Sequence, residues 1–460
     1  MPGVLGTAND ASPRPAGEEA GNAGALAWYG LTVLMMTTLF ALVVRQMLSL
    51  VGPSLQTSLH FSDLQIGMLQ GLGMAVFACI ASYPMGWLAD RFGRRLILAV
   101  GVAIWSLATC FCAFQNSFAG LFAGTIGIAI GEAGLAPIVY ALIPDMFAER
   151  QRNTANLVFY AGSLFGTGVG MALGGAMLEW LATAPNDLPT WLMGVDSWRI
   201  GLVVTALPGP LFFVLVVTMP LAKRMAGSRD AGRASGTPEA MTAFLPYAKA
   251  HWPALVCVFG SIFAMAMAMT SGLVWFPLAL PRAFGIDPAT VGVGLGTAVT
   301  AATLIGVLLP GLALKLSGRF GGLPPIRVAA IFAWLTPLPA VFLPFVTSPF
   351  QAYMVAALQG AAGVACSALM PGILQDLAPA HLRSRVLSLL GIVNALALAG
   401  SPLAIGALSG LLDGPRGLLY SIALISVPSL VAAAVLIGLA RHPYAGTARA
   451  IRTQFSGATI

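Results

Sequence analysis

The sequence predicts an all-α membrane protein whose twelve transmembrane helices form two pseudo-symmetric bundles of six. Three observations lead to this fold class: composition, the number of long apolar runs, and an internal repeat. Of the 460 residues, 58% are hydrophobic and only 8% are charged. Soluble domains carry roughly 25% charged residues, and a soluble fold could not cover so much apolar surface.

Each predicted span is a run of about 20 mainly apolar residues, the length that crosses a bilayer. In chain order these runs are 27–52, 64–87, 96–115, 118–147, 154–181, 199–221, 253–281, 288–315, 326–347, 350–375, 385–411 and 417–440. The polar connection 223–250 divides them into an N-terminal bundle (25–222) and a C-terminal bundle (251–441). Residues 1–24, rich in Ala, Gly and Pro, are expected to form a disordered cytoplasmic tail, and 442–460 a second cytoplasmic tail.

Basic residues gather on one side of this twelve-span map, as the positive-inside rule describes for cytoplasmic loops. That side holds Arg91, Arg94, Arg95, Arg150, Arg152, Lys223, Arg224, Lys315, Arg319, Arg383, Arg385 and Arg441, whereas the other has Arg199, Arg282 and Arg416. Both termini and the 223–250 linker are therefore expected in the cytoplasm, with the protein in a plasma membrane, the inner membrane of a bacterium. Since no basic stretch is interleaved with aromatic residues, nucleic acid is not an expected partner.

The two halves carry equivalent loops. The segment GWLADRFGRR (86–95) follows the second span, and GLALKLSGRF (311–320) follows the eighth. IPDMFAERQR after the fourth span is echoed by LQDLAPAHLRSR after the tenth, which aligns Asp145 with Asp376. Such parallel repeats indicate two related bundles with a substrate path between them.

Arg45 and Glu132 are the clear ionisable residues deep within the predicted spans. A charge at the bilayer centre costs about 2.5–3.5 kcal/mol on insertion scales, so such residues usually pair or face a wet cavity. Their predicted depths leave direct contact open. Our functional interpretation has Arg45 binding an anionic substrate group and Glu132 carrying a proton in competition for the same cation. The alternative is a buried ion pair that only fixes helix packing.

The C-terminal half offers polar and adaptable side chains rather than mid-span charges. The expected substrate-binding residues are Arg45, Glu132, Tyr140, Tyr160, Ser271, Trp275, Gln359 and Asn394. Except for Arg45 and Glu132, residues of these types in a span more often serve helix packing than ligand binding. Met265 and Met269 are expected to share a helix face, which suits an apolar, adaptable wall.

The loop GWLADRFGRR resembles the signature of the major facilitator superfamily, with Gly86, Asp90, Arg91, Gly93 and Arg94 at the matching positions. The resemblance implies the major facilitator fold and a gating role for this loop. Asp145 and Arg152, in the segment after the fourth span, are assigned to the same gating group.

Residues 40–180 are more closely similar to the Spinster-like transporters, which include carriers of lysophospholipids and sphingoid-base phosphates. The segments that carry the likeness are RQMLSLV, LQIGMLQGLGMAVF and GEAGLAPIVYALIPDMF. Two positions depart from the family: Val44 replaces the usual Asp before the arginine, and Thr125 replaces an arginine on the fourth helix. The resemblance implies a secondary transporter of a small amphiphilic anion that works by alternating access, with proton coupling open.

Other functions find less support in the sequence. The chain has no phosphate-binding P-loop, HExxH or GxSxG motif, so neither an enzyme nor an ATP-driven pump is expected, and no cofactor or metal is implied. GTGVGMALGG (166–175) and VGVGLG (291–296) lie within apolar spans and predict close helix packing instead of a nucleotide loop. The alternatives left open are an organic-anion or multidrug transporter and a non-transporting membrane sensor. The expected partners are the bilayer, the substrate and protons, with the protein a monomer.

Overall fold

The computed structural model describes residues 16–147, 149–183, 194–219, 246–319, 322–379 and 382–447. Within these ranges twelve helical spans are long and apolar enough to cross a membrane. The predicted fold class is thereby confirmed, and the spans match the predicted order. Most of the 1–24 tail, the 223–250 linker and the 442–460 tail lies outside the described residues.

The N-terminal half begins with α1 (Ala16–Leu50), which continues almost without a break into α2 (Gly52–Leu59). The second span combines α3 (Asp63–Gly67), the π-helix η1 (Met68–Val76) and α4 (Phe77–Phe92). The remaining helices of this half are α5 (Arg94–Ala113), α6 (Phe118–Ala133), α7 (Leu135–Met146), α8 (Glu149–Thr183), α9 (Ser197–Ala206) and α10 (Gly209–Thr218).

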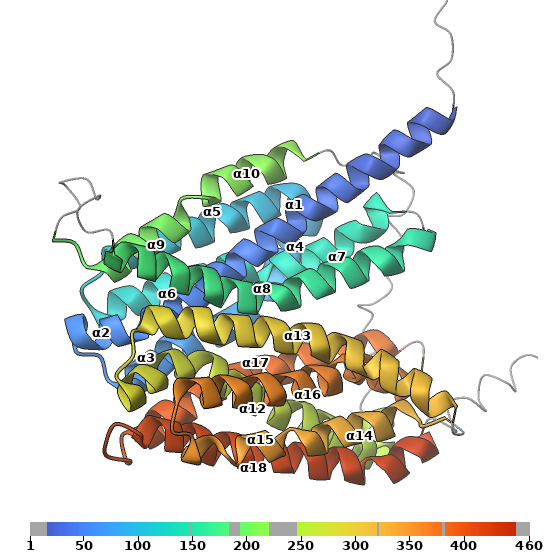
Figure 1. The fold of residues 1–460 in the computed structure, drawn as a ribbon. Coiled ribbons are helices and arrows are strands. Elements are labelled where there is room, and N and C mark those ends of the chain that lie inside the picture. Colours follow the sequence, from blue (N-terminus) through green and yellow to red (C-terminus); the bar gives the residue numbers. More distant parts are fainter. Residues whose placement is uncertain are drawn as a thin grey trace, which may run out of the picture.

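The C-terminal half repeats the arrangement. These are α12 (Trp252–Phe284), α13 (Pro288–Gly318), α14 (Pro325–Leu335), α15 (Pro337–Ala340), η4 (Leu343–Phe345), α16 (Pro349–Asp376), α17 (Arg383–Ser409) and α18 (Gly417–Leu439). In Figure 1 the first half forms the upper bundle and the second half the lower one.

Helix ends follow local chemistry. Ser62 and Gln65 form a reciprocal capping box at the start of α3, and Ser117 accepts from the backbone N–H of Gly120 at the start of α6. Gly93 separates α4 from α5 with φ of +102°, a conformation that side chains with a Cβ rarely adopt. Backbone geometry therefore requires the glycine at position 93 of the 86–95 loop.

The two bundles meet along α8 and α13, which run side by side at the boundary (Figure 1). A Cβ atom on Gly175 would lie 2.6 Å from the backbone nitrogen of Val293, and one on Gly296 would lie 2.4 Å from that of Ala172. Only glycine permits so close an approach of two backbones. The expected role of both glycine-rich segments in close helix packing is confirmed.

Three clusters of buried apolar residues organise the interior of the described ranges, and one of them spans both halves. That shared cluster includes Leu55 and Ile66 from the first half together with Leu278 and Leu418 from the second. Each of the other two belongs to a single half. The shared core lies toward the end where the second span begins at Asp63, and the separate cores lie toward the 86–95 loop. In the described part of the chain, the apolar core that the two halves share therefore lies at one end.

Candidate functional site

Arg45 lies on α1 and Glu132 in the last turn of α6, from where each enters the interior of the first bundle. The two charges interact electrostatically, yet no ion pair or hydrogen bond joins them in the described part of the chain. The Oε1 atom of Glu132 is buried and has no hydrogen-bond partner. Both residues are therefore near one another but unpaired, which leaves the guanidinium and the carboxyl free to engage other groups.

Tight packing of α5 against α6 fixes the position of Glu132. A Cβ on the preceding residue, Gly131, would lie 2.6 Å from the backbone nitrogen of Trp105 and 2.7 Å from the carbonyl oxygen of Gly101. The helix then breaks at Gly134 before α7 begins. The small residues that surround Glu132 thus hold α6 against α5 and define the depth of the carboxyl group.

Ser49 and Gln70 form a buried polar contact that sequence reasoning missed. The Ser49 hydroxyl donates to Oε1 of Gln70 at 2.5 Å, and both side chains are buried. Ser49 lies one helical turn beyond Arg45 on α1. Gln70 lies in η1, where the π-helical turn widens the backbone spacing; such turns are frequent at functional sites. A lone glutamine among glycines in an apolar run gave no periodic signal that could have identified it.

A cavity of about 490 Å³ opens mainly within the second bundle. Its wall comes from the C-terminal half, with Tyr160, Leu164 and Thr167 of α8 contributed by the first half. Met265, Met269 and Met370 give it flexible apolar surface. The expectation that Met265 and Met269 share a face is confirmed. Cavities of this size accommodate small organic ligands.

The structure brings four of the expected substrate-binding residues to this cavity: Tyr160, Ser271, Gln359 and Asn394. Ser271 donates to the carbonyl of Ala268 at 2.6 Å, and the Asn394 amide donates to that of Leu390 at 3.0 Å. Both side chains are therefore partly engaged by their own helices. Gln359 and the Tyr160 hydroxyl have no hydrogen bond to another described residue, so both remain available to a ligand.

The other four expected residues lie elsewhere. Arg45 and Glu132 are not part of the cavity wall. Trp275 is fully buried in the core shared by the two halves, and its indole nitrogen has no partner among the described residues. Tyr140 packs edge-on against Phe159, with ring centroids 5.2 Å apart, and is 40% exposed. Arg45 and Glu132 are thus separate from the apolar cavity.

The residues expected to gate transport cluster around Arg94. Its Nη1 donates to Oδ2 of Asp145 at 2.6 Å and to the carbonyl of Ala141 at 2.7 Å, and its Nη2 lies 3.6 Å from Oδ1 of Asp90. The loop at 86–95 is thereby tied to α7 within the first half.

Three further members of the predicted gating group are not bonded to Arg94 in the described ranges. Arg152 donates to the carbonyls of Phe147 and Pro144, each at 3.2 Å, and so fastens the start of α8 to the end of α7. Arg91 instead lies over the Trp87 ring at 5.3 Å from its centroid. A Cβ on Gly86 would meet no atom within 4 Å, so close packing does not require glycine there.

Comparison with known proteins defines the family. The Major Facilitator Superfamily model matches residues 34–402. The protein spinster of Drosophila melanogaster is 27% identical over 205 residues, which cover 44% of this chain and 31% of the relative. The sphingosine-1-phosphate transporter SPNS2 of Mus musculus is 31% identical over 238 residues, 50% of this chain and 40% of the relative. The chain thus matches less than half the length of these two relatives.

Two further matches cover most of the chain. An MFS-type efflux pump of Mycolicibacterium smegmatis is 25% identical over 394 residues, 85% of this chain and 86% of the relative. A crystal structure of a bacterial homologue of the human lysosomal transporter Spinster, inward-facing and unoccupied, superposes with a TM-score of 0.75 at 21% identity and covers 93% of this chain and 98% of the other. These matches are to transporters, which are not enzymes. The chain therefore belongs to the Major Facilitator Superfamily, as a multi-pass membrane protein that is similar in sequence and fold to Spinster proteins.

Proposed function

We propose that this transporter moves a small amphiphilic anion, with a lysophospholipid or a sphingoid phosphate as the substrate class, by alternating access. One observation carries the proposal: an apolar, methionine-lined cavity of about 490 Å³ in one half accompanies an unpaired arginine in the other. An amphiphile needs both kinds of surface. The name of the mouse relative, a sphingosine-1-phosphate transporter, is consistent with this class.

In this proposal, Arg45 binds the anionic headgroup and the second-half cavity receives the apolar tail. A guanidinium suits phosphate because its planar fork can donate two parallel hydrogen bonds. Tyr160 and Gln359 line the cavity with donors that other side chains do not occupy. These two residues are assigned to the region where the polar and apolar parts of the substrate meet.

Glu132 is the proposed proton carrier. Its buried carboxyl interacts with the charge of Arg45 without being tied to it. When a substrate anion neutralises Arg45, the carboxylate loses its favourable partner, and protonation becomes the less costly state in an apolar interior. Substrate binding and proton uptake would then favour one another. The same proposal puts both termini and the 86–95 loop in the cytoplasm, on the basis of the basic residues.

Reconstituted transport tests this function. Proteoliposomes would be offered radiolabelled lysophosphatidate, sphingosine 1-phosphate and, as small anions, citrate and benzoate, each with and without a pH gradient. We expect the two lysolipids to be transported, and Arg45→Ala to reduce their uptake at least tenfold. Arg45→Lys is the matched control: it keeps the charge but loses the fork, and should retain part of the activity.

Two outcomes would contradict the proposal. Transport of citrate or benzoate that lysolipids do not inhibit would indicate an organic-anion carrier. Full lysolipid transport by Arg45→Ala would remove Arg45 from headgroup binding. Separation by thin-layer chromatography should identify intact lysolipid inside the vesicles, since a hydrolysed product would indicate chemistry rather than transport.

A further inference from the structure

The described residues that line the second-half cavity include no charged side chain, yet several of them are polar. Four of these polar residues come from four different helices: Thr270 of α12, Thr303 of α13, Gln359 of α16 and Ser426 of α18. Thr270, Thr303 and Ser426 are only 7%, 4% and 2% exposed. We refer to the four residues as the polar ring.

None of the four side chains forms a hydrogen bond with another described residue, and the Ser426 hydroxyl oxygen is fully buried without a partner. Hydroxyls within helices commonly donate to the backbone carbonyl one turn before them. Thr300 on α13 and Ser421 on α18 do so, at 2.8 and 2.9 Å. The ring hydroxyls thus differ from hydroxyls on the same helices, since their hydrogen-bonding capacity is open toward the cavity.

Contacts between helices show that Thr303 and Gln359 lie at nearly the same depth. A Cβ on Gly360, which follows Gln359, would lie 3.3 Å from the Cβ of Ala302, which precedes Thr303. Each helical residue rises 1.5 Å, so the two ring residues are within about 3 Å of one another along the helix axes.

Thr270 lies close to the same depth. A Cβ on Gly363, one turn from Gln359 on α16, would lie 2.6 Å from the sulfur of Met269, the residue before Thr270. One helical turn corresponds to about 5.4 Å, which bounds the difference in depth between Thr270 and Gln359.

Ser426 completes the ring from the twelfth span. The Ser261 hydroxyl donates to the carbonyl oxygen of Ala433 at 2.8 Å and thereby aligns α12 with α18. The seventh and twelfth spans run in opposite directions, so seven residues from this contact α18 reaches Ser426 where α12 reaches position 268. Ser426 and Thr270 are therefore within about 3 Å in depth. The polar ring is a band about one helical turn high that crosses four helices.

The chemistry of the ring favours an uncharged ligand group. Each hydroxyl can donate one hydrogen bond and accept others, and the amide of Gln359 has both kinds of atom. A phosphate or an ammonium group at this depth would lose its hydration without meeting an opposite charge among the described lining residues. A hydroxyl group, which both donates and accepts, suits the ring without that penalty.

We propose that the polar ring binds a hydroxyl group carried on the apolar chain of the substrate, away from its anionic head. Arg45 lies outside the cavity wall, so the head and the chain hydroxyl are bound at separate places. A plain chain leaves the buried ring hydroxyls unpaired, whereas a hydroxylated chain pairs them, and the cavity therefore prefers the hydroxylated chain. The inference rests on the proposed function for the anionic head only.

Equilibrium binding to the purified full-length protein in lipid nanodiscs tests the ring. The probes are tritium-labelled methyl stearate and its isomers with one added hydroxyl at successive carbons along the chain. Binding is measured by scintillation proximity, after subtraction of the signal from empty nanodiscs. These esters have no anionic head, so their binding depends neither on Arg45 nor on transport. A parallel series of lysophosphatidates carries the same chains.

We expect at least one isomer hydroxylated within the chain to bind about tenfold more tightly than methyl stearate, because an unpaired buried hydroxyl is costly. Thr303→Val and Ser426→Ala should each reduce this preference at least threefold and leave the affinity for methyl stearate unchanged. Thr300→Val and Ser421→Ala are the matched controls on the same two helices. Their hydroxyls are bonded to the backbone, so both variants should keep the preference.

Equal affinity for all the esters, or a preference that survives Thr303→Val combined with Ser426→Ala, would overturn the proposal. A preference confined to the isomer hydroxylated beside the ester group would contradict a chain-borne hydroxyl. Both ring variants should unfold at or above the midpoint of the unmodified protein, since each loses a buried group without a partner. A lower midpoint in both would instead assign these hydroxyls to structure.

The two series of probes separate this inference from the proposed function. Lysophosphatidates that do not bind, beside neutral esters that keep their hydroxyl preference, would contradict the proposed function and leave the ring in place. Lysophosphatidates that bind with no preference for any hydroxylated chain would contradict the ring alone.

Discussion

At the scale of single residues, two acidic side chains of the interior differ in the number of hydrogen bonds that they accept. Asp63 accepts four hydrogen bonds from Arg282, Gln56 and Ser409, whereas the Oε1 atom of Glu132 is buried without any. An acid saturated with donors is held as a carboxylate, and an acid without donors in an apolar place is the one that can gain a proton at modest cost. The contrast supports the proposal that Glu132, and not Asp63, carries the proton.

Glu132→Gln is expected to abolish the response of substrate uptake to an imposed pH gradient, because the amide cannot exchange a proton. Substrate exchange at equal pH on both sides should persist. The measurement compares initial uptake rates in proteoliposomes with and without the gradient. Glu179→Gln, the same change at an exposed position near the end of α8, serves as the control and should respond to the gradient like the unmodified protein. A gradient response that survives in Glu132→Gln would show that another group carries the proton.

At the scale of helices, equivalent acidic residues of the two halves have different bonding partners. Asp145 of the first half forms an ion pair with the guanidinium of Arg94. Asp376, its counterpart in the repeat, accepts a hydrogen bond from the Tyr444 hydroxyl at 2.6 Å. The side chains of Arg94 and Asp145 are 32% and 52% exposed, so the ion pair contributes only about 0–1 kcal/mol. The contact between α8 and α13, by contrast, involves no ion pair among the described residues: it depends on glycines, whose lack of a Cβ atom leaves room for a neighbouring backbone.

Gly175→Ala is expected to lower the thermal unfolding midpoint in detergent, because its Cβ would lie 2.6 Å from a backbone nitrogen of α13. Overpacking of this kind costs about 1–3 kcal/mol. Gly311→Ala, in α13 where a Cβ meets nothing within 4 Å, should raise the midpoint because alanine favours helix by about 1 kcal/mol over glycine. The test is whether the two substitutions shift the unfolding midpoint in opposite directions. A midpoint that rises equally in both variants would mean that α8 and α13 can separate without cost.

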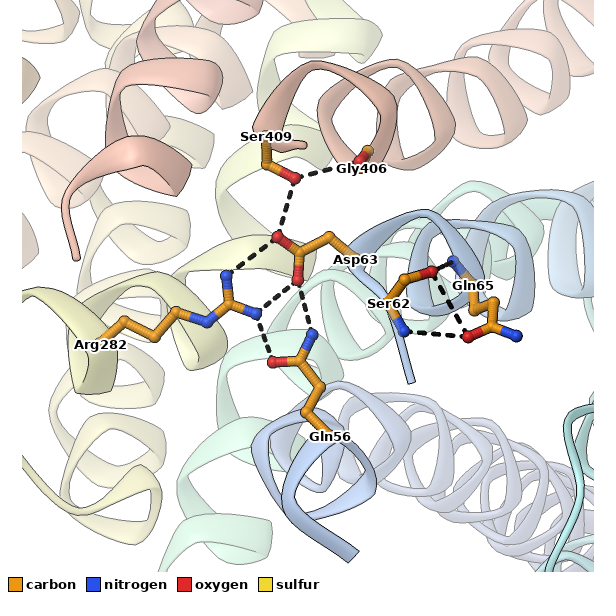
Figure 2. Close-up of polar contacts among 7 residues, drawn as sticks. All are labelled: Gln56, Ser62, Asp63, Gln65, Arg282, Gly406 and Ser409. Atoms are coloured by element: carbon orange, nitrogen blue, oxygen red, sulfur yellow. Dashed lines mark hydrogen bonds and ion pairs between the residues drawn. The ribbon is translucent and has the colours of Figure 1, made fainter. Parts of the chain in front are cut away.

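At the scale of the whole molecule, contacts between the bundles are distributed unequally along the membrane normal. One end has a shared apolar core and the ion pair between Asp63 and Arg282 (Figure 2), and the other has two separate cores. This arrangement is the one expected of a transporter with a single open end, since two bundles that rock about a midplane site can close at only one end at a time. Which compartment faces the open end depends on the orientation in the membrane.

Thiol labelling in intact cells tests that orientation. In a variant without native cysteines, Ser58→Cys in α2, between the first two spans, should react with a membrane-impermeant maleimide from outside the cell. Arg91→Cys, exposed in the 86–95 loop, should react only after the membrane is opened. The expected labelling ratio for Arg91→Cys before and after opening is below about one to ten. The reverse pattern would place the termini outside and contradict the positive-inside assignment.

The sequence by itself determined the fold class, the order of the spans and the family, because these follow from apolar run length, loop charge and the 86–95 motif. It also indicated Arg45 and Glu132, since a charge within an apolar run is conspicuous wherever the helix lies. The packing of both glycine-rich segments could likewise be predicted, because small residues in a span have few other uses.

Only the tertiary structure decided which side chains meet. Asp63 accepts hydrogen bonds from Arg282 and Ser409, which are 219 and 346 positions away, and a polar residue at the end of a span gives no signal of a distant partner. The same holds for Ser49 and Gln70, and for the division of the expected binding residues between the cavity wall and other sites. Periodicity specifies which residues share a face of one helix, whereas rotation and tilt between helices depend on the close packing of the whole interior.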